Sequence, residues 1–328
     1  MRRIIPVILT LLGVSFSGAI QAQGALATVN YADTSKSPLY SQYYVAQAKG
    51  YFAKHGLNVV AVSVGAGGPV LAAMASGDID VGGIAPPQAV LATYSGAAIR
   101  IVAGGEVPVP YAAMARTGVN ANSIKDFKGM KLANVGPGTG FDAMTRFLLR
   151  ADGIDPDKDV QLVTIGVTPG AWVSAFQNSL VDAAVVTVEP WISLIEDAKL
   201  GRKVVDLAKT GLAGVPKQLN TAFLGSGRWI KEKPDVARRF VAAIGEANAF
   251  LNNPANRDEG VAIVNKAIGG DPKVARKTLD AIGSNWSTLV TRENISDTLK
   301  FMKATKMIPD NADLKFENLI AEGITPTK

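Results

Sequence analysis

The clearest pattern of apolar and polar positions surrounds Ser76–Gln88. A helix rich in apolar residues ends at Gly77, an apolar strand follows over Ile79–Ile84, and a loop of small residues leads into Pro86 and Pro87. Two prolines suit the first turn of a helix, because N–H groups at that place have no intrahelical partner to lose. The pattern therefore predicts a helix, a strand and a second helix, with a loop at the carboxyl end of the strand.

The same order of elements recurs further along the chain. A helix is expected over Trp172–Asn178 and an apolar strand over Val181–Val188, and the turn Glu189–Trp191 then opens another helix. Ligands of open α/β sheets bind at the carboxyl ends of the strands. Two copies of one unit therefore predict two similar lobes with a ligand between them.

Strands alternate with helices along most of the chain, which predicts an α/β fold with parallel, doubly wound sheets. Two crossing segments, near 106–111 and 218–222, interrupt the alternation and predict a two-strand hinge between the lobes. On this division lobe I comprises residues 23–106 and 221–328, with a helical cap at its C-terminal end, and lobe II comprises residues 107–220. Longer helices are expected over Ser41–His55, Phe141–Asp152, 235–251, 258–267, 272–282 and 292–303.

The first residues have the anatomy of a signal peptide. The basic residues Arg2 and Arg3 precede an apolar run over Ile4–Val14, and small or polar residues follow. The run is short for a segment that spans a bilayer. We expect residues 1–22 to be a signal peptide, with cleavage between residues 22 and 27, and a retained membrane anchor is the alternative. The predicted location is the periplasm.

The composition is typical of a compact globular protein. The chain has 328 residues, of which 48% are hydrophobic and 19% charged, enough for two domains with a core in each. It has no cysteine, which excludes disulfides, thiolate metal sites and a lipid-modified cysteine, and which suits an exported protein of this size. The net charge of +6 is spread without a basic cluster, so no nucleic-acid or membrane partner is expected. We expect a monomer.

Signatures of catalysis are absent from the sequence. The single histidine, His55, lies at the end of a predicted helix, where a capping or solvated role is expected. No Gly-x-Ser-x-Gly motif is present, and the third glycine of Gly136–Gly140 comes too early for a dinucleotide-binding loop. The turn Gly65–Gly68 lacks the Lys-Ser/Thr of a phosphate-binding loop. We therefore expect no enzymatic activity, no metal and no cofactor.

The candidate ligand-binding residues share a position at the carboxyl ends of predicted strands. Small residues in these loops let a ligand approach backbone N–H groups, and the following helix dipoles favour an anion. Aromatic residues beside the loops would form walls of a small-molecule cleft or, alternatively, belong to the core. The candidates are Ser35, Lys36, Ser37, Tyr40, Gly67, Gly68, Ala85, Pro86 and Gln88 in lobe I, and Gly138, Thr139, Gly140, Phe141, Thr168, Trp172, Glu189 and Trp191 in lobe II.

Glu189 allows two interpretations. At the end of its strand, its carboxylate could accept a hydrogen bond from an amine or ring N–H of a ligand. It could instead pair with a group of lobe I and hold the lobes closed. The sequence leaves both open.

Five stretches taken in order resemble a known family of proteins. They are Tyr43–Val59 (YYVAQAKGYFAKHGLNV), Gly65–Gly68, Ala75–Gly83 (ASGDIDVGG), Ile124–Leu132 (IKDFKGMKL) and Val181–Trp191. Together they are similar to periplasmic binding proteins of the aliphatic sulfonate, taurine and nitrate type, the NMT1/THI5-like family. The similarity covers nearly all of the chain after the leader.

The resemblance implies a two-lobed, type II periplasmic binding fold that closes on a small solute and delivers it to the permease and ATPase subunits of an ABC importer. Members bind sulfonates, nitrate, pyrimidines, flavins or aromatic acids. A small organic anion, sulfonate- or carboxylate-like, is our leading prediction, and a pyrimidine-like or aromatic ligand, for import or for a sensor subunit, is the alternative. Pyrimidine-forming enzymes of the superfamily use a cysteine-rich iron motif, which this chain lacks. The implied ligand loops are Ser37–Tyr40, Gly67–Gly68, Ala85–Gln88, Gly138–Phe141 and Glu189–Trp191.

Overall fold

The computed structural model of the chain describes residues 25–33, 36–64, 68–105, 111–137, 139–187, 191–206 and 221–328. Several predictions concern residues outside this set and stay predictions. They are the signal peptide, most of the two hinge segments, and the candidate residues Ser35, Gly67, Gly138 and Glu189.

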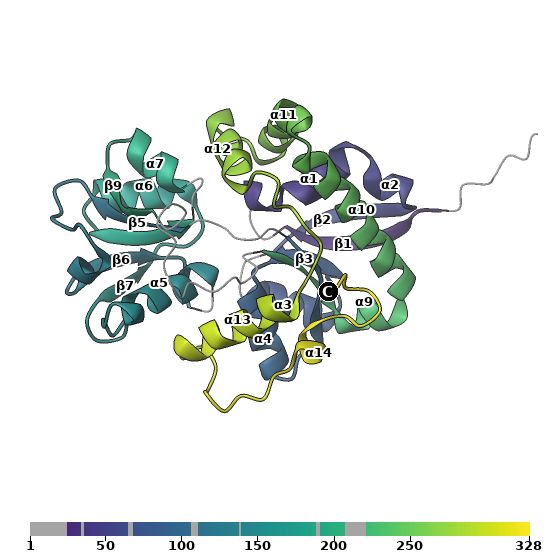
Figure 1. Cartoon of the computed structure of the whole chain (residues 1–328). Coiled ribbons are helices and arrows are strands. Elements are labelled where there is room, and N and C mark those ends of the chain that lie inside the picture. The colour runs from purple at the N-terminus through teal and green to yellow at the C-terminus, as the bar shows by residue number, and fades with distance from the viewer. Residues whose placement is uncertain are drawn as a thin grey trace, which may run out of the picture.

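Two mixed five-stranded sheets organise the described residues (Figure 1). The first has the order β2-β1-β3-β10-β4 and belongs to what we call lobe I; the second has the order β7-β6-β8-β5-β9 and belongs to lobe II. The strands of lobe I are β1 (Ala27–Asp33), β2 (Leu57–Ser63), β3 (Val81–Ile84), β4 (Ile99–Gly104) and β10 (Ala222–Ser226). Those of lobe II are β5 (Tyr111–Arg116), β6 (Lys131–Asn134), β7 (Gln161–Thr164), β8 (Ala183–Thr187) and β9 (Gly201–Asp206).

The α/β class is confirmed, but the sheets are mixed and not wholly parallel. In lobe I, β10 runs antiparallel between β3 and β4. In lobe II, β5 runs antiparallel between β8 and β9. Parallel neighbours need a crossover connection, usually a helix. The strand before β5 in the sequence, β4, belongs to the other sheet, and so does the strand before β10, which is β9. Neither β5 nor β10 is therefore connected to the preceding strand of its own sheet by a crossover helix.

Helices cover both sheets, mostly where the sequence predicts them. The helix expected over Ser41–His55 is an exception, because Gly50 has a φ of +70° and divides it into two. The helices around the lobe I sheet are η1 (Pro38–Tyr40), α1 (Ser41–Ala48), α2 (Tyr51–Lys54), α3 (Gly68–Ser76) and α4 (Pro86–Tyr94). Those of lobe II are η2 (Ile124–Phe127), α5 (Gly140–Ala151), α6 (Pro169–Gln177) and α7 (Trp191–Asp197).

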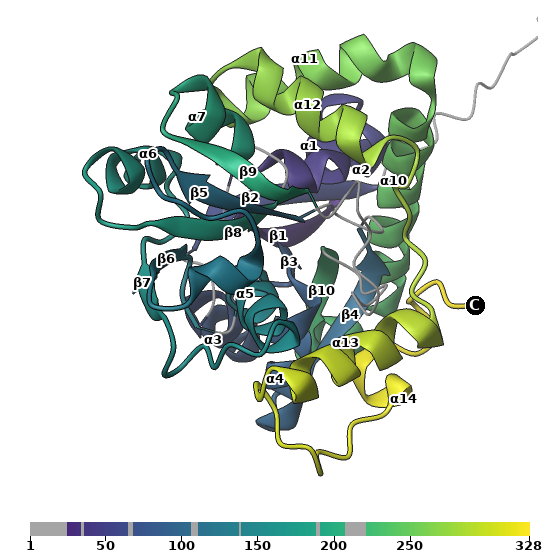
Figure 2. The same cartoon turned by 60° about the vertical axis from the view of Figure 1, so that its left-hand side comes forward.

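The C-terminal helices pack around the lobe I sheet and also reach lobe II (Figure 2). Figure 2 shows α12 beside α7 at one end of the line where the lobes meet, and α13 beside α5 at the other. At the second contact the rings of Phe147 and Phe301 lie 5.2 Å apart between centroids, inside an apolar cluster that includes residues of both sheets. These helices are α9 (Gly227–Glu232), α10 (Pro234–Asn252), η3 (Pro254–Asn256), α11 (Arg257–Ile268), α12 (Pro272–Ile282), α13 (Arg292–Ala304) and α14 (Phe316–Leu319).

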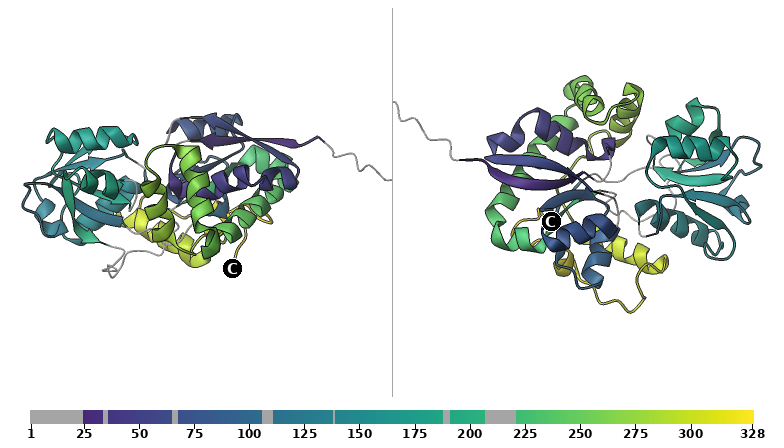
Figure 3. Two further views of the ribbon diagram at one scale, coloured as in Figure 1. Left: turned by 90° about the horizontal axis from the view of Figure 1, so that it is seen from above. Right: turned by 180° about the vertical axis from the view of Figure 1, so that it is seen from behind.

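The two lobes lie side by side, as the views from above and from behind show (Figure 3). A second apolar cluster, under α1, α10 and α12, contains Phe240 and Trp229 and stabilises lobe I. A third, in lobe II, is built around Trp172 and Trp191. The exact boundaries of the lobes lie in the segments 106–110 and 207–220, so the predicted division stays a prediction.

Candidate ligand-binding site

Two helix N-termini from different lobes meet at the carboxyl ends of their strands. Ala85 caps α4 after β3, and Gly140 is the first residue of α5, which follows β6. A Cβ atom added to Gly140 would lie 3.7 Å from the Cβ of Ala85 and 3.6 Å from the Oη of Tyr111. The structure thus brings together two loops that the sequence predicts for ligand binding, one from each lobe.

The N-terminus of α4 has few free backbone N–H groups, and its main hydrogen-bonding group is the side-chain amide of Gln88. Pro86 and Pro87 have no N–H, and the N–H of Gln88 donates to the Ala85 carbonyl at 3.0 Å. The Gln88 side chain is 7% exposed, and its amide makes no hydrogen bond to any described residue. The Gln88 amide is thus a hydrogen-bonding group at the start of α4 that other described residues leave unused, and its role toward a ligand stays a prediction.

The N-terminus of α5 does offer backbone donors. Thr139 caps the helix: its hydroxyl accepts a hydrogen bond from the N–H of Asp142 at 3.2 Å and donates to the Gly136 carbonyl at 2.8 Å. No acceptor for the N–H groups of Gly140 and Phe141 is found among the described residues. The first N–H groups of a helix, together with its dipole, form an anion-binding position.

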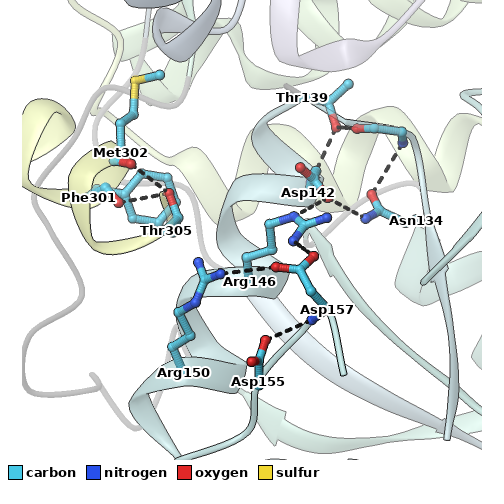
Figure 4. Close-up of polar contacts among 11 residues, drawn as sticks. Asn134, Thr139, Asp142, Arg146, Arg150, Asp155, Asp157, Phe301, Met302 and Thr305 are labelled. Atoms are coloured by element: carbon cyan, nitrogen blue, oxygen red, sulfur yellow. Dashed lines mark hydrogen bonds and ion pairs between the residues drawn. The ribbon is translucent and has the colours of Figure 1, made fainter. Parts of the chain in front are cut away.

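A buried carboxylate holds this loop in place (Figure 4). Asp142, 3% exposed, accepts hydrogen bonds from Asn134 Nδ2 at 2.8 Å and from Arg146 Nε at 2.9 Å. The Asn134 Oδ1 in turn accepts from the N–H of Gly136 at 3.3 Å. One carboxylate therefore links the end of β6 and the glycine loop to the body of α5.

Arg146 balances the charge of Asp142. It also donates to Asp157, so it lies between two carboxylates. Burial acts to lower the pKa of Arg146, but hydrogen bonds to Asp157 and Asp142 and the charges of both outweigh it, so the pKa is raised above its ordinary value. The pairing keeps the carboxylate of Asp142 from acting as an unbalanced negative charge near the end of α5.

The loop before α1 places Tyr40 beside β3. Ser37 caps η1, because its hydroxyl accepts from the N–H of Leu39 at 3.3 Å, whereas Lys36 is exposed. Gly83 makes room for two tyrosines, since a Cβ added there would lie 2.7 Å from the Oη of Tyr31 and closer still to the ring of Tyr40. Tyr40 is half-buried, and its neighbour Gly83 precedes Ala85 by two residues. It therefore lies near the meeting point of α4 and α5.

Phe141 is backed by two tryptophans. Its ring centroid lies 5.9 Å from that of Trp172 and 5.8 Å from that of Trp191, and the two indoles are 4.9 Å apart. Trp172 is 0% exposed and its indole N–H donates to the Gly166 carbonyl at 2.8 Å; Trp191 is 7% exposed. Phe141, half-buried, is the ring of the three with most surface left for a ligand.

Two candidates lie at exposed helix starts. Thr168 caps α6 without a side-chain hydrogen bond to the helix, and Gly68 opens α3 with nothing within 4 Å of an added Cβ. Neither has a described contact with the Ala85–Gly140 junction. Their assignment to the site stays a prediction.

Two features of this region do not follow from the sequence patterns above. Tyr111 reaches Gly140 because β5 begins there, directly after the predicted hinge. The Asp142 network joins Asn134 to α5, and its only trace in the sequence is the Thr139-x-x-Asp142 spacing, which is typical of a helix N-terminus.

Neither a metal-binding cluster nor a membrane-spanning helix is found in the described part of the chain. Within it, no group of three His, Cys, Asp or Glu residues is placed to hold a metal ion. No described helix combines the length and the apolar character needed to cross a bilayer. His55 caps the end of α2, and its Nε2 lies 2.7 Å from Oε1 of Glu246.

The two α/β sheets, each with an antiparallel strand placed next to its edge strand, define the fold of periplasmic binding proteins. The alkanesulfonate-binding protein SsuA from Xanthomonas axonopodis pv. citri, solved with bound MOPS, matches with a TM-score of 0.71 and 17% identity, over 93% of this chain and 99% of that one. The periplasmic nitrate-binding protein NrtA from Synechocystis PCC 6803 matches with a TM-score of 0.67 and 17% identity, over 88% and 83%. At these identities the likeness concerns the fold alone.

The sequence profile of the NMT1/THI5-like family matches residues 37–257, and the chain belongs to this family. A Brucella abortus (strain 2308) protein named only as a binding protein is 31% identical over 255 residues, which are 77% of this chain and 74% of the relative. The nitrate/nitrite binding protein NrtA of Nostoc sp. is 27% identical over 235 residues, 66% of this chain and 52% of the relative. The family and the fold expected from the sequence are thus confirmed.

Proposed function

We propose that this protein is the solute-binding component of an ABC importer and that it captures a small organic anion between its two lobes. It acts in the periplasm after removal of its leader, as a monomer, and hands the solute to permease and ATPase subunits without transforming it. The family and the fold support this function at the level of the protein class. The ligand and the importer are the proposal.

The meeting of Ala85 and Gly140 carries the proposal. A ligand beside this contact would reach the N-terminus of α4 in lobe I and the N-terminus of α5 in lobe II at the same time. Binding shifts an equilibrium between open and closed states only as far as the ligand prefers one of them. A ligand that contacts both lobes prefers the closed state, and its binding therefore closes the protein.

The donors at this junction favour an anion. The N–H groups of Gly140 and Phe141 lie at the positive end of α5, a helix long enough to carry a substantial dipole. The Gln88 amide adds a donor from lobe I. A sulfonate or carboxylate needs this set of donors, and relatives of similar fold are named as alkanesulfonate- and nitrate-binding proteins.

The aromatic residues favour a second candidate, a pyrimidine-like or aromatic ligand. Phe141 presents part of its ring while Trp172 and Trp191 hold it from behind, and Tyr40 lies in the opposite lobe near Ala85. A planar ligand would stack on Phe141 and accept or donate hydrogen bonds at Gln88. In both cases we assign Trp172 to support of Phe141 and not to ligand contact.

A thermal-shift panel tests the function directly. The protein without residues 1–22 is melted with alkanesulfonates including MOPS, nitrate, carboxylates, aromatic acids, pyrimidines and flavins. A ligand present at a hundred times its Kd adds about 2.7 kcal/mol to the free energy of unfolding, which a melting scan resolves. The proposal predicts a rise in Tm with a sulfonate or carboxylate. A rise with pyrimidines or aromatic acids alone selects the second candidate, and no rise with any compound contradicts both.

A further inference from the structure

At the end of the lobe boundary opposite to α5 and α13, helix α12 of lobe I lies beside α7 of lobe II (Figure 2), and a lysine joins the two helices. Lys277 lies on α12, and its Nζ donates a hydrogen bond to Oγ of Ser193 on α7 at 2.6 Å. The carboxylate of Asp197, also on α7, lies 3.9 Å from the same Nζ. Ser193 is 2% exposed, whereas the Lys277 side chain is 45% exposed. A long, partly solvated side chain therefore reaches a buried hydroxyl of the other lobe.

The ammonium group has no described partner in its own lobe. Both groups that contact Lys277 Nζ belong to α7. Separation of the lobes removes both contacts at once and returns the ammonium group to water. The interaction exists only when α12 and α7 are adjacent, so it stabilises the closed arrangement relative to any open one.

The two helices joined by Lys277 both lead to the proposed ligand site. On the lobe II side, α7 begins at Trp191, whose indole packs against Phe141 at the N-terminus of α5. On the lobe I side, α12 packs on η1, the short helix that ends at Tyr40. Lys277 is placed to hold these two walls of the site together without being part of either.

The interlobe contact between α5 and α13 has a different character. Phe147 and Phe301 pack ring to ring within an apolar cluster that continues into both sheets. Such a contact is costly to open, because it exposes apolar surface. A single polar contact that is half in solvent is much weaker. The lobes are therefore expected to pivot about α5 and α13 and to open at α7 and α12.

We propose that Lys277 is an interlobe positioning residue that shifts the protein toward its closed state and slows ligand release without contacting the ligand. The statement about ligand release rests on the proposed function. The statement about closure does not, because the contact with Ser193 needs no ligand.

The experiment uses the absence of cysteine in the chain. Ala262→Cys on α11 and Gln177→Cys on α6, both at exposed positions, introduce two spin labels, one in each lobe. Double electron–electron resonance then measures the distribution of distances between the lobes in the ligand-free protein. Lys277→Met is compared with Lys273→Met, which removes an exposed lysine one turn earlier on the same helix.

We expect Lys277→Met to raise the ratio of open to closed protein by about two- to fivefold, as for a partly exposed polar pair, and Lys273→Met to leave it unchanged. Ser193→Ala should raise the ratio by a smaller factor, because Lys277 keeps its contact with Asp197, and the double variant should open the lobes no further than Lys277→Met alone. Equal distributions for Lys277→Met and Lys273→Met would overturn the proposal. Ser193 is buried, and Ser193→Ala could unfold the protein; the comparison of Lys277→Met with Lys273→Met does not depend on that variant.

A kinetic measurement covers the second half of the proposal. With MOPS as the probe, or the compound that raises Tm in the panel, Lys277→Met should increase koff more than it decreases kon. An unchanged koff contradicts the effect on release. If no compound in the panel binds while Lys277→Met still opens the lobes, the proposed function fails and the effect on closure stands.

Discussion

Ala85 and Gly140 stand across the interlobe boundary with space for one methyl group between them: a Cβ on Gly140 would lie 3.7 Å from the Cβ of Ala85. That separation is ordinary van der Waals contact, so the boundary is already closed at this point. Each residue begins a helix at the carboxyl end of a strand, one in each lobe. We therefore expect the ligand to lie beside this contact, where the N-termini of both helices are within reach.

This spacing predicts that Gly140 tolerates alanine but not a larger residue. Gly140→Ala adds the methyl group at 3.7 Å and should leave both Tm and ligand affinity nearly unchanged. Gly140→Val places further methyl groups against Ala85 or Tyr111, so closure is obstructed and affinity should fall at least tenfold, on the order of 1.4 kcal/mol. Calorimetric titration of both variants checks this. Equal affinities for Gly140→Val and the unchanged protein would remove the Ala85–Gly140 junction from the site.

The Asp142 network predicts a difference between two aspartates that share Arg146. Asp142→Asn leaves the buried Asn134 amide and the partly buried Arg146 guanidinium with a weaker acceptor, so the free energy of unfolding should fall by about 1–3 kcal/mol. Asp157 is 58% exposed, and Asp157→Asn should cost less than about 1 kcal/mol. Urea denaturation of both variants measures the difference. Similar losses would show that burial of Asp142 does not determine its contribution.

Substitutions at Phe141 and Trp172 should have different effects: the first on ligand affinity and the second on the free energy of unfolding. Phe141→Ala removes a half-buried ring at the junction and should weaken ligand affinity by about 1–3 kcal/mol. Trp172→Phe removes the buried indole N–H that donates to Gly166, so it should lower the free energy of unfolding and leave affinity nearly unchanged. Titrations and urea denaturation of both variants provide the comparison. A loss of affinity in Trp172→Phe with stability intact would place that indole in the site.

The ion pairs of Glu246 should make the free energy of unfolding depend on pH in the acid range. Hydrogen bonds from Lys54 and His55 hold its pKa below the ordinary value of 4.5. A carboxylate with a lowered pKa stabilises the folded state at any pH above its unfolded pKa, and this stabilisation is lost as the pH falls through the folded pKa. Glu246→Gln should therefore be less stable than the unchanged protein at neutral pH, and the difference should shrink below pH 4.5. A constant difference across this range would show that the pairing contributes nothing.

Local patterns in the sequence identify the ends of strands well. Ala85, Pro86 and Gly140 each lie where an apolar strand gives way to a helix, and such a pattern depends only on neighbouring residues. The helix division at Gly50 is also local, but glycine within a helical pattern does not reveal whether its φ is positive.

Contacts between residues that are far apart in the chain could not be predicted from local sequence patterns. The antiparallel entry of β5 and β10 depends on chain crossings between lobes. Whether Trp172 faces a ligand or lies behind Phe141 depends on which side of α6 packs on the sheet. Lys277 and Ser193 are 84 residues apart and carry no common motif. The roles of such residues can be assigned only once the fold shows which side chains are in contact.

The central claim is that a small organic anion binds between α4 and α5 and contacts both lobes. A crystal structure of the protein without residues 1–22, grown with the compound that gives the largest rise in Tm, tests it most directly. We expect ligand density beside the Ala85–Gly140 contact, within reach of both Gln88 and Phe141, with the anionic group at the N–H groups of Gly140 and Phe141. Density confined to one lobe, or away from this junction, would contradict it.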